Sequence, residues 1–321
     1  MGEFELIRNY FAAAPCAQPG EGVALGIGDD CALLSLKAGE QLAVSTDTLV
    51  AGVHFPEVCD PFLLGQRALG VSASDLAAMG ASPLAFTLAL TLPAVSATWL
   101  EAFARGLNAM AQQCSLRLVG GDTTRGPLSL TVTVFGAVPV GQALTRAGAR
   151  PGDLLCVGGT LGDGAGALPF VLNQRSAEAS TTQALLARYW SPLPQLALGQ
   201  ALQGKATSAL DISDGLLADC GHIALASGVG LRVERDKVPM SDALLALFNP
   251  DEALNAALSG GDDYRLAFTL PASCLAELID AGWSIHVIGQ VVEGQGVVLV
   301  DGLGHDVTPS TRGYQHFRET R

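Results

Sequence analysis

The chain has 321 residues and a mass of 32.9 kDa, a length that suits two domains or one large one. Hydrophobic residues make up 49% of the sequence and charged residues 15%, which provides for a packed core and excludes an intrinsically disordered chain. Acidic residues number 31 against 18 basic ones, so the formal net charge is −13. This acidity argues against binding to nucleic acid or to an anionic membrane, because both partners require a basic surface.

The cysteines and the N-terminal sequence indicate a cytoplasmic protein. The seven cysteines are scattered, odd in number and free of C-x-x-C pairs, as expected of reduced thiols. The N-terminal stretch carries Glu3 and Glu5 and has no apolar run typical of a signal peptide. The longest apolar stretch, residues 84–95, contains Thr and Pro and is too short to span a bilayer.

The first half of the chain is rich in predicted strands. Helices are expected at residues 3–11, 61–79 and 96–114, the last capped by Ser96. Strands are expected at residues 23–28, 31–36, 41–47, 84–92, 116–120 and 128–138. Residues 139–151 carry Gly and Pro and read as a connector, so we expect an N-terminal domain over 1–138 and a C-terminal domain over 139–321.

The second half also mixes strands and helices. Strands are expected at residues 153–157, 209–212, 231–233, 264–268, 285–290 and 297–300. Helices are expected from residue 164 and at residues 181–189, 194–202, 215–226 and 271–281. The whole chain therefore predicts two α/β or α+β domains.

Acidic residues recur beside Gly, Ser and Thr where strands are expected to end. They are Asp29, Asp30, Asp47, Asp122, Asp211, Asp214, Asp262 and Asp263, with Asp75 in a helical segment. Each one alone is typical of a turn or a helix cap. As a set, carboxylates at strand ends meet at one edge of a sheet and repel unless cations lie between them. Mg²⁺ suits carboxylates and the hydroxyls of Ser45 and Thr46, and metal bridges would let an acidic protein bind polyphosphates.

One glycine pattern allows a different interpretation. The spacing Gly162-x-Gly164-x-x-Ala167 is typical of a dinucleotide-binding turn. However, residues 158–161 separate it from the preceding strand, and Glu178, the acid at the expected distance, lies in a polar stretch. A nicotinamide or flavin site therefore stays an alternative to a plain helix-opening turn.

Other catalytic motifs find little support in the sequence. Gly199-x-x-x-x-Gly204-Lys205 is followed by Ala206, so it lacks the hydroxyl that a phosphate-binding P-loop needs. No histidine and cysteine spacing fits zinc, and no G-x-S-x-G element indicates a hydrolase.

Few histidines or basic residues lie near the acids. Among the five histidines only His54 is close to them in sequence. One of Arg67, Arg125 and Arg146 is a candidate to neutralise phosphate charge in a transition state.

Seven motifs in order, covering nearly the whole chain, resemble the thiamine-monophosphate kinase family of the aminoimidazole ribonucleotide synthetase-like superfamily. They are GIGDDCA at 26–32, STDTLVAGVHF at 45–55, SDLAAMGASP at 74–83, VGGDTTRG at 119–126, DISDGL at 211–216, GGDDYRL at 260–266 and GYQHF at 313–317. The resemblance implies two α/β domains, a homodimer formed through the N-terminal domain, and a cleft between the domains for ATP, Mg²⁺ and thiamine phosphate.

The resemblance also implies roles for particular residues. The implied metal ligands are Asp30, Ser45, Thr46, Asp47, Asp75, Asp122, Asp211 and Asp214. The implied nucleotide contacts are Gly121, Asp122, Arg146 and Ser213, and the implied contacts to thiamine are His54, Asp262 and Tyr314. Among these, Asp47, Asp122 and Arg146 are the candidate catalytic residues. The chain departs from the family at Asp262, where Glu is usual, and at Arg105, where an aromatic residue is frequent.

The expected reaction is transfer of the γ-phosphoryl group of ATP to the phosphate of thiamine monophosphate. That phosphate is largely dianionic at neutral pH and attacks in line without a general base. Several Mg²⁺ ions would screen the repulsion between the anions, and Asp262 and the ring of Tyr314 suit the cationic thiazolium. The alternatives are another ATP-dependent phosphotransferase or synthetase of the superfamily, a nicotinamide-dependent oxidoreductase, and a non-catalytic metal-binding scaffold.

Overall fold

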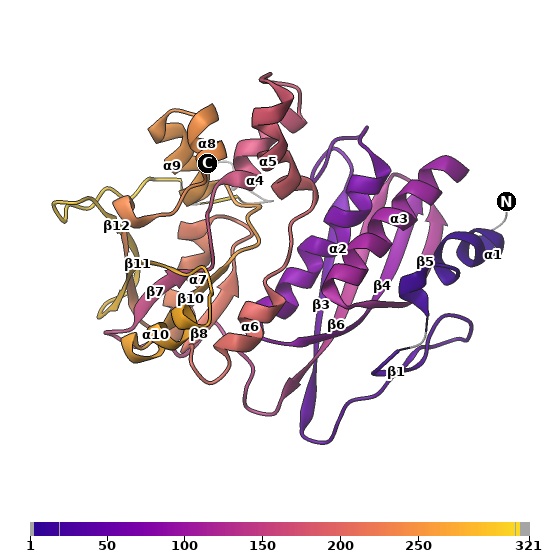
Figure 1. Ribbon diagram of the computed structural model, residues 1–321, viewed down its shortest axis with the longest axis horizontal. Helices are drawn as coiled ribbons and strands as arrows, with labels where there is room; N and C mark the ends of the chain where they lie inside the picture. The colour runs from indigo at the N-terminus through magenta and orange to yellow at the C-terminus, as the bar shows by residue number, and fades with distance from the viewer. Residues whose placement is uncertain (1–2, 19, 312, 315–321) are drawn as a thin grey trace, which may run out of the picture. The chain divides into compact units, whose positions relative to one another are not determined.

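The computed structural model describes residues 3–18, 20–311 and 313–314 and divides into two compact units (Figure 1). Unit 1 comprises the described residues of Met1–Leu76, Ala81–Gly141 and Trp190–Leu196. Unit 2 comprises those of Ala77–Gly80, Gln142–Tyr189 and Ala197–Arg321. Both units combine helices with a sheet, so the predicted α/β class with two domains is confirmed.

Unit 1 is built on a four-stranded sheet with the strand order β3-β6-β4-β5. Its strands are β3 (Glu40–Val50), β4 (Ser82–Leu92), β5 (Arg117–Arg125) and β6 (Ser129–Pro139). The β4–β5 pair is parallel and the other two pairs are antiparallel. Helices α2 (Pro61–Ala78) and α3 (Ala97–Cys114) lie against one face of the sheet (Figure 1).

Side chains alternate between the two faces of this sheet. On β6, Leu130, Val132 and Val134 are buried, whereas Thr131 and Thr133 are partly exposed. The same alternation on β3 leaves Val44 55% exposed. Such a pattern is typical of an antiparallel sheet whose one face packs on helices while the other has no cover within the unit.

The remaining elements of unit 1 precede the sheet in sequence. They are α1 (Glu3–Leu6), a π-helix η1 (Ile7–Ala12), a 3₁₀-helix η2 (Pro15–Ala17), and the antiparallel pair β1 (Val23–Leu25) and β2 (Leu33–Leu34).

Unit 2 contains a six-stranded sheet with the strand order β12-β9-β11-β7-β10-β8. Its strands are β7 (Leu154–Val157), β8 (Ser208–Asp211), β9 (Gly230–Glu234), β10 (Leu266–Leu270), β11 (His286–Val292) and β12 (Gly296–Val300). The β9–β12 pair is parallel and the other pairs are antiparallel. Helix α7 (Leu216–Ser227) packs on this sheet, and its Leu216, Leu217 and Ile223 share one buried cluster with Leu155 and Leu231 of the strands.

The other helices of unit 2 are short. They are α4 (Asp163–Val171), α5 (Ala179–Trp190), α6 (Leu196–Leu202), the 3₁₀-helix η3 (Arg235–Lys237), α8 (Asp242–Leu247), α9 (Pro250–Ser259) and α10 (Ala272–Asp280). Sequence patterns did not predict α8 or α9. Both carry recognisable caps, since Ser241 accepts a hydrogen bond from Leu244 N and Asn249 forms a capping box with Glu252.

Two strands extend beyond their predicted ends. β3 continues to Val50 and β5 to Arg125, so Asp47 and Asp122 lie within strands, and the prediction that they end strands is wrong. The reason is that β3 and β5 are the two edges of the sheet, where one side lacks a partner strand and polar residues and glycines are tolerated. Asp211, by contrast, ends β8 as predicted.

One strand of unit 2 begins later than predicted. β10 starts at Leu266 rather than at residue 264, because Asp262 and Tyr264 adopt φ angles of 63° and 50°. A strand requires negative φ, so these two residues belong to a tight loop before it.

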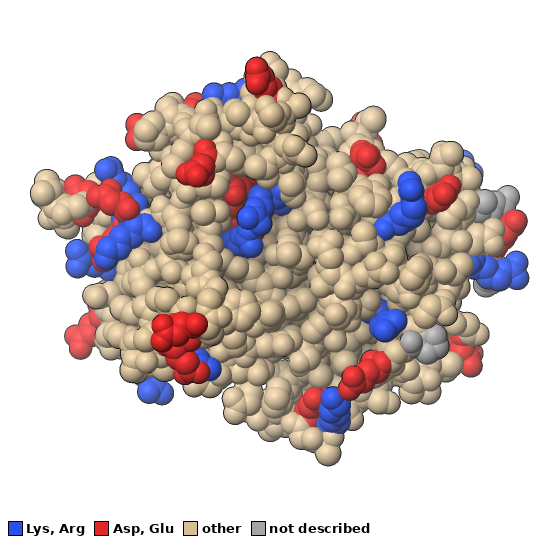
Figure 2. Space-filling model, in the orientation of Figure 1, with Lys and Arg blue, Asp and Glu red and all other residues tan. Residues whose placement is uncertain are grey.

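No helix in the part of the chain that the structure describes is long and apolar enough to cross a membrane. Figure 2 shows Lys and Arg residues scattered over the visible face, often beside acidic residues, without a continuous basic band among the described residues there.

Candidate functional site

The inner face of the unit 1 sheet carries a pair of carboxylates. Asp47 on β3 points toward α2, where Asp75 lies close enough for its charge to act on Asp47. Burial, and to a smaller extent the charge of Asp75, raises the pKa of Asp47 to about 6. A hydrogen bond that Ser72 donates to Asp47 acts in the opposite direction. Ser45, two residues before Asp47 on the same face, donates to Asp75 Oδ2 at 2.5 Å. The two carboxylates and the hydroxyls of Ser45 and Ser72 thus form one partly buried group of oxygen atoms.

Thr46 lies on the other face of the same strand. Its hydroxyl bonds to that of Thr133 on β6 at 2.9 Å, and Thr48 bonds to Thr131 in the same way. The side chains of Thr46 and Asp47 therefore point to opposite faces of the sheet, as the alternation of a strand requires.

A second group of predicted residues lines a pocket of about 850 Å³ at the β5 edge. Asp30, Gly121 and Asp122 all face this pocket, together with residues of the π-helix such as Phe11. Gly121 has a φ of 147°, and a Cβ there would collide with the backbone of Leu88. The strand pair thus needs glycine at this position, which exposes backbone to the pocket.

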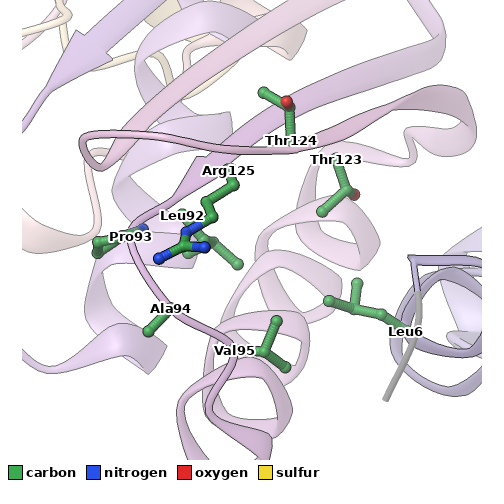
Figure 3. A pocket seen from close by; sticks show the side chains of 8 residues that line it. All are labelled: Leu6, Leu92, Pro93, Ala94, Val95, Thr123, Thr124 and Arg125. Atoms are coloured by element: carbon green, nitrogen blue, oxygen red, sulfur yellow. The ribbon is translucent and has the colours of Figure 1, made fainter.

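A smaller pocket of about 430 Å³ adjoins the first, because Thr123 lines both. Figure 3 shows that Arg125 extends beside Leu92 and Pro93 in this pocket. Arg125 was a candidate for neutralising phosphate charge, and none of the metal, nucleotide or thiamine residues predicted from the motifs lines this cavity.

His54 lies in the turn that follows β3. Its Nδ1 accepts a hydrogen bond from Val50 N at 3.0 Å, and its carbonyl accepts one from the buried Arg67 at 3.5 Å. Since Nδ1 accepts, the neutral ring carries its proton on Nε2.

The motif DISDG forms a tight turn in unit 2 that joins three segments by backbone hydrogen bonds. Its carbonyls accept bonds from the segments that carry Asp262 and Tyr314. The bonds are Tyr264 N to Ile212 O at 2.8 Å, Asp262 N to Ser213 O at 2.9 Å, and Tyr314 N to Asp214 O at 3.0 Å. The predicted nucleotide residue Ser213, metal ligand Asp214 and substrate residues Asp262 and Tyr314 are therefore neighbours.

Asp262 is held in place by its own loop. Tyr264 Oη donates to Asp262 Oδ1 at 2.9 Å, and both residues have positive φ. Tyr314 is 46% exposed, whereas Gln315, His316 and Phe317 of the same motif lie outside the described residues. Non-glycine residues in the left-handed region cost on the order of 1 kcal/mol each and concentrate at functional sites.

The glycine pattern considered for a dinucleotide serves this same loop. Gly162 N donates to both carboxylate oxygens of Asp263, at 2.8 and 3.0 Å. A Cβ on Gly164 would collide with the carbonyl of Asp262. The glycines thus provide close packing between the turn before α4 and the GGDDY loop.

The predicted ligands do not form one cluster. Within residues 3–18, 20–311 and 313–314, no group of three or more His, Cys, Asp or Glu side chains is placed to hold a metal ion. Asp47 and Asp122 lie on opposite edges of a four-stranded sheet, roughly 14 Å apart at about 4.8 Å per strand. Arg146 is exposed in a loop of unit 2, where its carbonyl accepts from Ser227 Oγ at 3.1 Å.

Comparison with known proteins decides the family. The N-terminal domain of AIR synthase related protein matches residues 28–138, and the C-terminal domain matches residues 150–302. Thiamine-monophosphate kinase of Escherichia coli (strain K12) is 47% identical over 322 residues, which cover 98% of each chain. The chain belongs to the thiamine-monophosphate kinase family.

Solved structures agree with this membership. Thiamine-monophosphate kinase from Stenotrophomonas maltophilia K279a is 45% identical, with a TM-score of 0.84 over 93% of this chain and 96% of that one. AaThiL complexed with AMPPCP and TMP is 31% identical, with a TM-score of 0.80 over 88% of this chain and 89% of that one. The resemblance read from the motifs is confirmed, and the nicotinamide alternative loses its support.

The sequence patterns did not single out two residues that shape the site of this family member. Asp219 is a carboxylate that binds backbone N–H groups of the DISDG turn, and Tyr264 bonds to Asp262. Asp263, which was among the expected acids, binds Gly162 N. A signal existed for Asp219, because an acid in the first turn of a helix is favourably placed to bind backbone N–H groups near the helix start.

Proposed function

We propose that this protein transfers the γ-phosphoryl group of ATP to thiamine monophosphate, yielding thiamine diphosphate and ADP. The observation that carries the proposal is the DISDG turn, whose backbone binds the Asp262 and Tyr314 segments directly. It is supported by whole-chain similarity to the Escherichia coli thiamine-monophosphate kinase and by the neighbour whose title names AMPPCP and TMP together.

Two separate groups of unit 1 residues, one beside β3 and one beside β5, suit Mg²⁺ by their chemistry. Ser45, Asp47, Asp75, Asp30 and Asp122 offer hydroxyl and carboxylate oxygens, the ligands this hard cation prefers. The raised pKa of Asp47 reports a carboxylate that lacks a compensating positive charge, and a divalent cation would supply one. The side chain of Thr46 lies on the other face of the sheet, so in this proposal Thr46 can contribute only backbone groups. When bound, Mg²⁺ neutralises phosphate charge and stabilises the transition state.

The remaining predicted residues act on the two substrates. Gly121, Asp122, Ser213 and Arg146 are the residues proposed to bind the nucleotide, and the guanidinium of Arg146 would offset charge on the transferred group. His54, Asp262 and Tyr314 would hold thiamine, with the Asp262 carboxylate and the Tyr314 ring facing a cationic heterocycle. The assignment gives every motif of the sequence a part in one reaction.

The chemistry needs positioning more than proton transfer. An oxygen of the thiamine phosphate attacks the γ-phosphorus in line, the bond from that phosphorus to the bridging oxygen breaks, and ADP leaves with the electron pair. Because the attacking phosphate is largely dianionic at neutral pH, no residue has to remove a proton. This agrees with a site made of carboxylates, hydroxyls and backbone groups.

We also propose a homodimer formed through the open face of the unit 1 sheet. On that face Leu42 is 44% exposed and Val44 55% exposed, next to the hydroxyl ladder of Thr46 and Thr133. A second copy of the same sheet would bury these apolar residues and give the sheet its missing layer.

A cytoplasmic location is part of the same proposal. All seven cysteines are free, and burial raises the pKa of the Cys114 and Cys156 thiols to about 12, so these thiols stay protonated and inert. Free thiols fit a reducing compartment that also supplies ATP.

The proposed reaction is tested by incubating the purified protein with ATP, Mg²⁺ and thiamine monophosphate. Phosphorus NMR should show thiamine diphosphate and ADP in equal amounts, and excess chelator should stop the reaction. Two controls replace thiamine monophosphate by thiamine or by a ribonucleotide monophosphate. Product from either control at the same rate would assign the protein to another phosphate acceptor.

A further inference from the structure

A buried carboxylate lies beneath the DISDG turn and binds it from the side of the helix. Asp219, in the first turn of α7, is 4% exposed. A single oxygen, Oδ2, accepts hydrogen bonds from the backbone N–H groups of Ser213, Asp214 and Gly215, each at 3.0 Å. The N–H groups of all three turn residues are therefore bonded to this one oxygen.

The carbonyl groups of the turn bind the two segments that are proposed to contact thiamine. The carbonyls of Ile212, Ser213 and Asp214 accept hydrogen bonds from the backbone of two other segments, the GGDDY loop and the segment of Tyr314. The turn is therefore bound on one side by Asp219 and on the other side by the residues proposed to contact thiamine. A shift of the turn moves both.

Asp219 binds the turn before α7 rather than capping the first turn of the helix. The N-cap of α7 is Gly215, which has no side chain to accept the free N–H groups at the helix start. Asp219 binds the N–H group of Gly215 and those of Ser213 and Asp214 in the turn before the helix. Burial of its carboxylate is unfavourable, and burial together with Asp214 raises the pKa of Asp219 to about 7 against the effect of the three N–H groups. A neutral cap of the Ser or Asn type would avoid this cost.

We propose that Asp219 is a positioning residue for the phosphoryl transfer, acting through the turn on both substrates at once. It holds Ser213 for the nucleotide and, through the carbonyls of the turn, the Asp262 and Tyr314 segments for thiamine phosphate. Asp219 itself touches neither substrate. This inference rests on the proposed kinase function and adds a residue that the motifs did not assign.

The variant that tests it is Asp219→Asn, which keeps the shape of the side chain and removes its charge. A neutral acceptor binds three N–H groups less strongly, so we expect kcat/KM to fall about 10- to 100-fold for ATP and for thiamine monophosphate alike. A residue that contacted one substrate directly would change the constants for that substrate alone. The Asp262→Asn variant supplies this comparison.

A matched control is Asp153→Asn in the same unit. Asp153 is also buried, at 6% exposure, and it accepts from Arg150 N at 3.0 Å and Thr207 Oγ1 at 2.7 Å. It binds neither the DISDG turn nor the GGDDY loop through any of these bonds. We expect Asp153→Asn to lower the melting temperature and to leave all kinetic constants near those of the unmodified protein.

Two readouts make the test independent of turnover. Hydrogen exchange of the Ser213, Asp214 and Gly215 amides should accelerate at least about tenfold in Asp219→Asn and stay slow in Asp153→Asn. Calorimetry with AMPPCP and Mg²⁺ should show weakened nucleotide binding in Asp219→Asn alone.

Unchanged affinity for AMPPCP and unchanged kinetic constants, with only a lower melting temperature, would reduce Asp219 to a structural cap and overturn the inference. If the unmodified protein makes no thiamine diphosphate, the proposed function fails, and the AMPPCP affinity of Asp219→Asn still decides whether Asp219 positions the nucleotide side.

Discussion

Asp47 on β3 and Asp75 on α2 lie so close on the inner face of the unit 1 sheet that the charge of Asp75 adds to burial in raising the pKa of Asp47 to about 6. In the unfolded chain this carboxyl has an ordinary pKa of 3.8. Between these values the folded protein binds more protons than the unfolded chain, so its stability falls as the pH rises through this window. At neutral pH the ionised Asp47 therefore destabilises the metal-free protein.

Removing that charge should stabilise the metal-free protein. We expect Asp47→Asn to raise the free energy of unfolding at pH 7.5 by up to about 3 kcal/mol, and to give no gain below pH 4, where the native carboxyl is protonated. Thermal unfolding followed by circular dichroism in excess chelator, at both pH values, measures this. A loss of stability at pH 7.5 would mean that the hydrogen bonds of ionised Asp47 outweigh its burial and its repulsion by Asp75.

The same pair predicts how Mg²⁺ binding depends on pH. Protons compete with the metal for Asp47, so the rise in melting temperature that Mg²⁺ produces should be larger at pH 7.5 than at pH 5.0. The dependence should shrink in Asp47→Asn. Ca²⁺ and a monovalent salt at matched ionic strength control for screening, and an equal shift at both pH values would argue that the metal binds elsewhere.

Loss of either unit 1 carboxylate should remove most activity from a folded protein. Asp47→Asn and Asp122→Asn each take away a proposed metal ligand, and loss of about 3 kcal/mol of transition-state stabilisation lowers kcat more than 100-fold. Asp236→Asn, at an exposed acid in η3, is the control and should keep full activity. Near-normal rates in both site variants would show that Asp47 and Asp122 have a structural role and do not bind the metal.

Asp262 should act on thiamine phosphate binding alone. Because it has a φ of 63°, the informative variant is Asn, which tolerates the left-handed region, rather than Ala, which adds backbone strain. Asp262→Asn removes a charge-assisted hydrogen bond worth roughly 1.5–3 kcal/mol, so KM for thiamine monophosphate should rise about 10- to 150-fold while kcat and KM for ATP stay constant. Asp262→Glu, which keeps the carboxylate, should be mild. A selective rise in KM for ATP would move Asp262 to the nucleotide.

The open sheet face should decide the oligomeric state. A charge in the middle of a buried apolar face is costly, so Val44→Asp should convert a dimer into monomers. Light scattering at micromolar concentration should give about twice 32.9 kDa for the unmodified chain and 32.9 kDa for the variant. Leu225→Asp, at a residue that is 83% exposed on α7, is the control and should leave the mass unchanged. A monomeric unmodified protein would contradict the proposal directly.

Residue order alone determined the class, the family and most elements of this protein. Periodic apolar residues locate α3, a run of apolar and small residues ending at Gly80 locates α2, and the alternation of Thr with Leu and Val locates β6, because these patterns depend on local geometry. The motifs likewise show the resemblance to the family, since the chemical character of each side chain is known from the sequence.

Only the tertiary structure determined the positions of the acidic side chains. Gly and Asp in VGGDTTR predicted the end of a strand, yet β5 continues through them because it is an edge strand that needs fewer partners. Whether Asp47 faces α2 or the open side depends on the register of β3 against β6, which no local pattern contains. The hydrogen bonds from Asp219 to the DISDG turn, and from that turn to the GGDDY loop, join residues that the fold, and not their order, brings together.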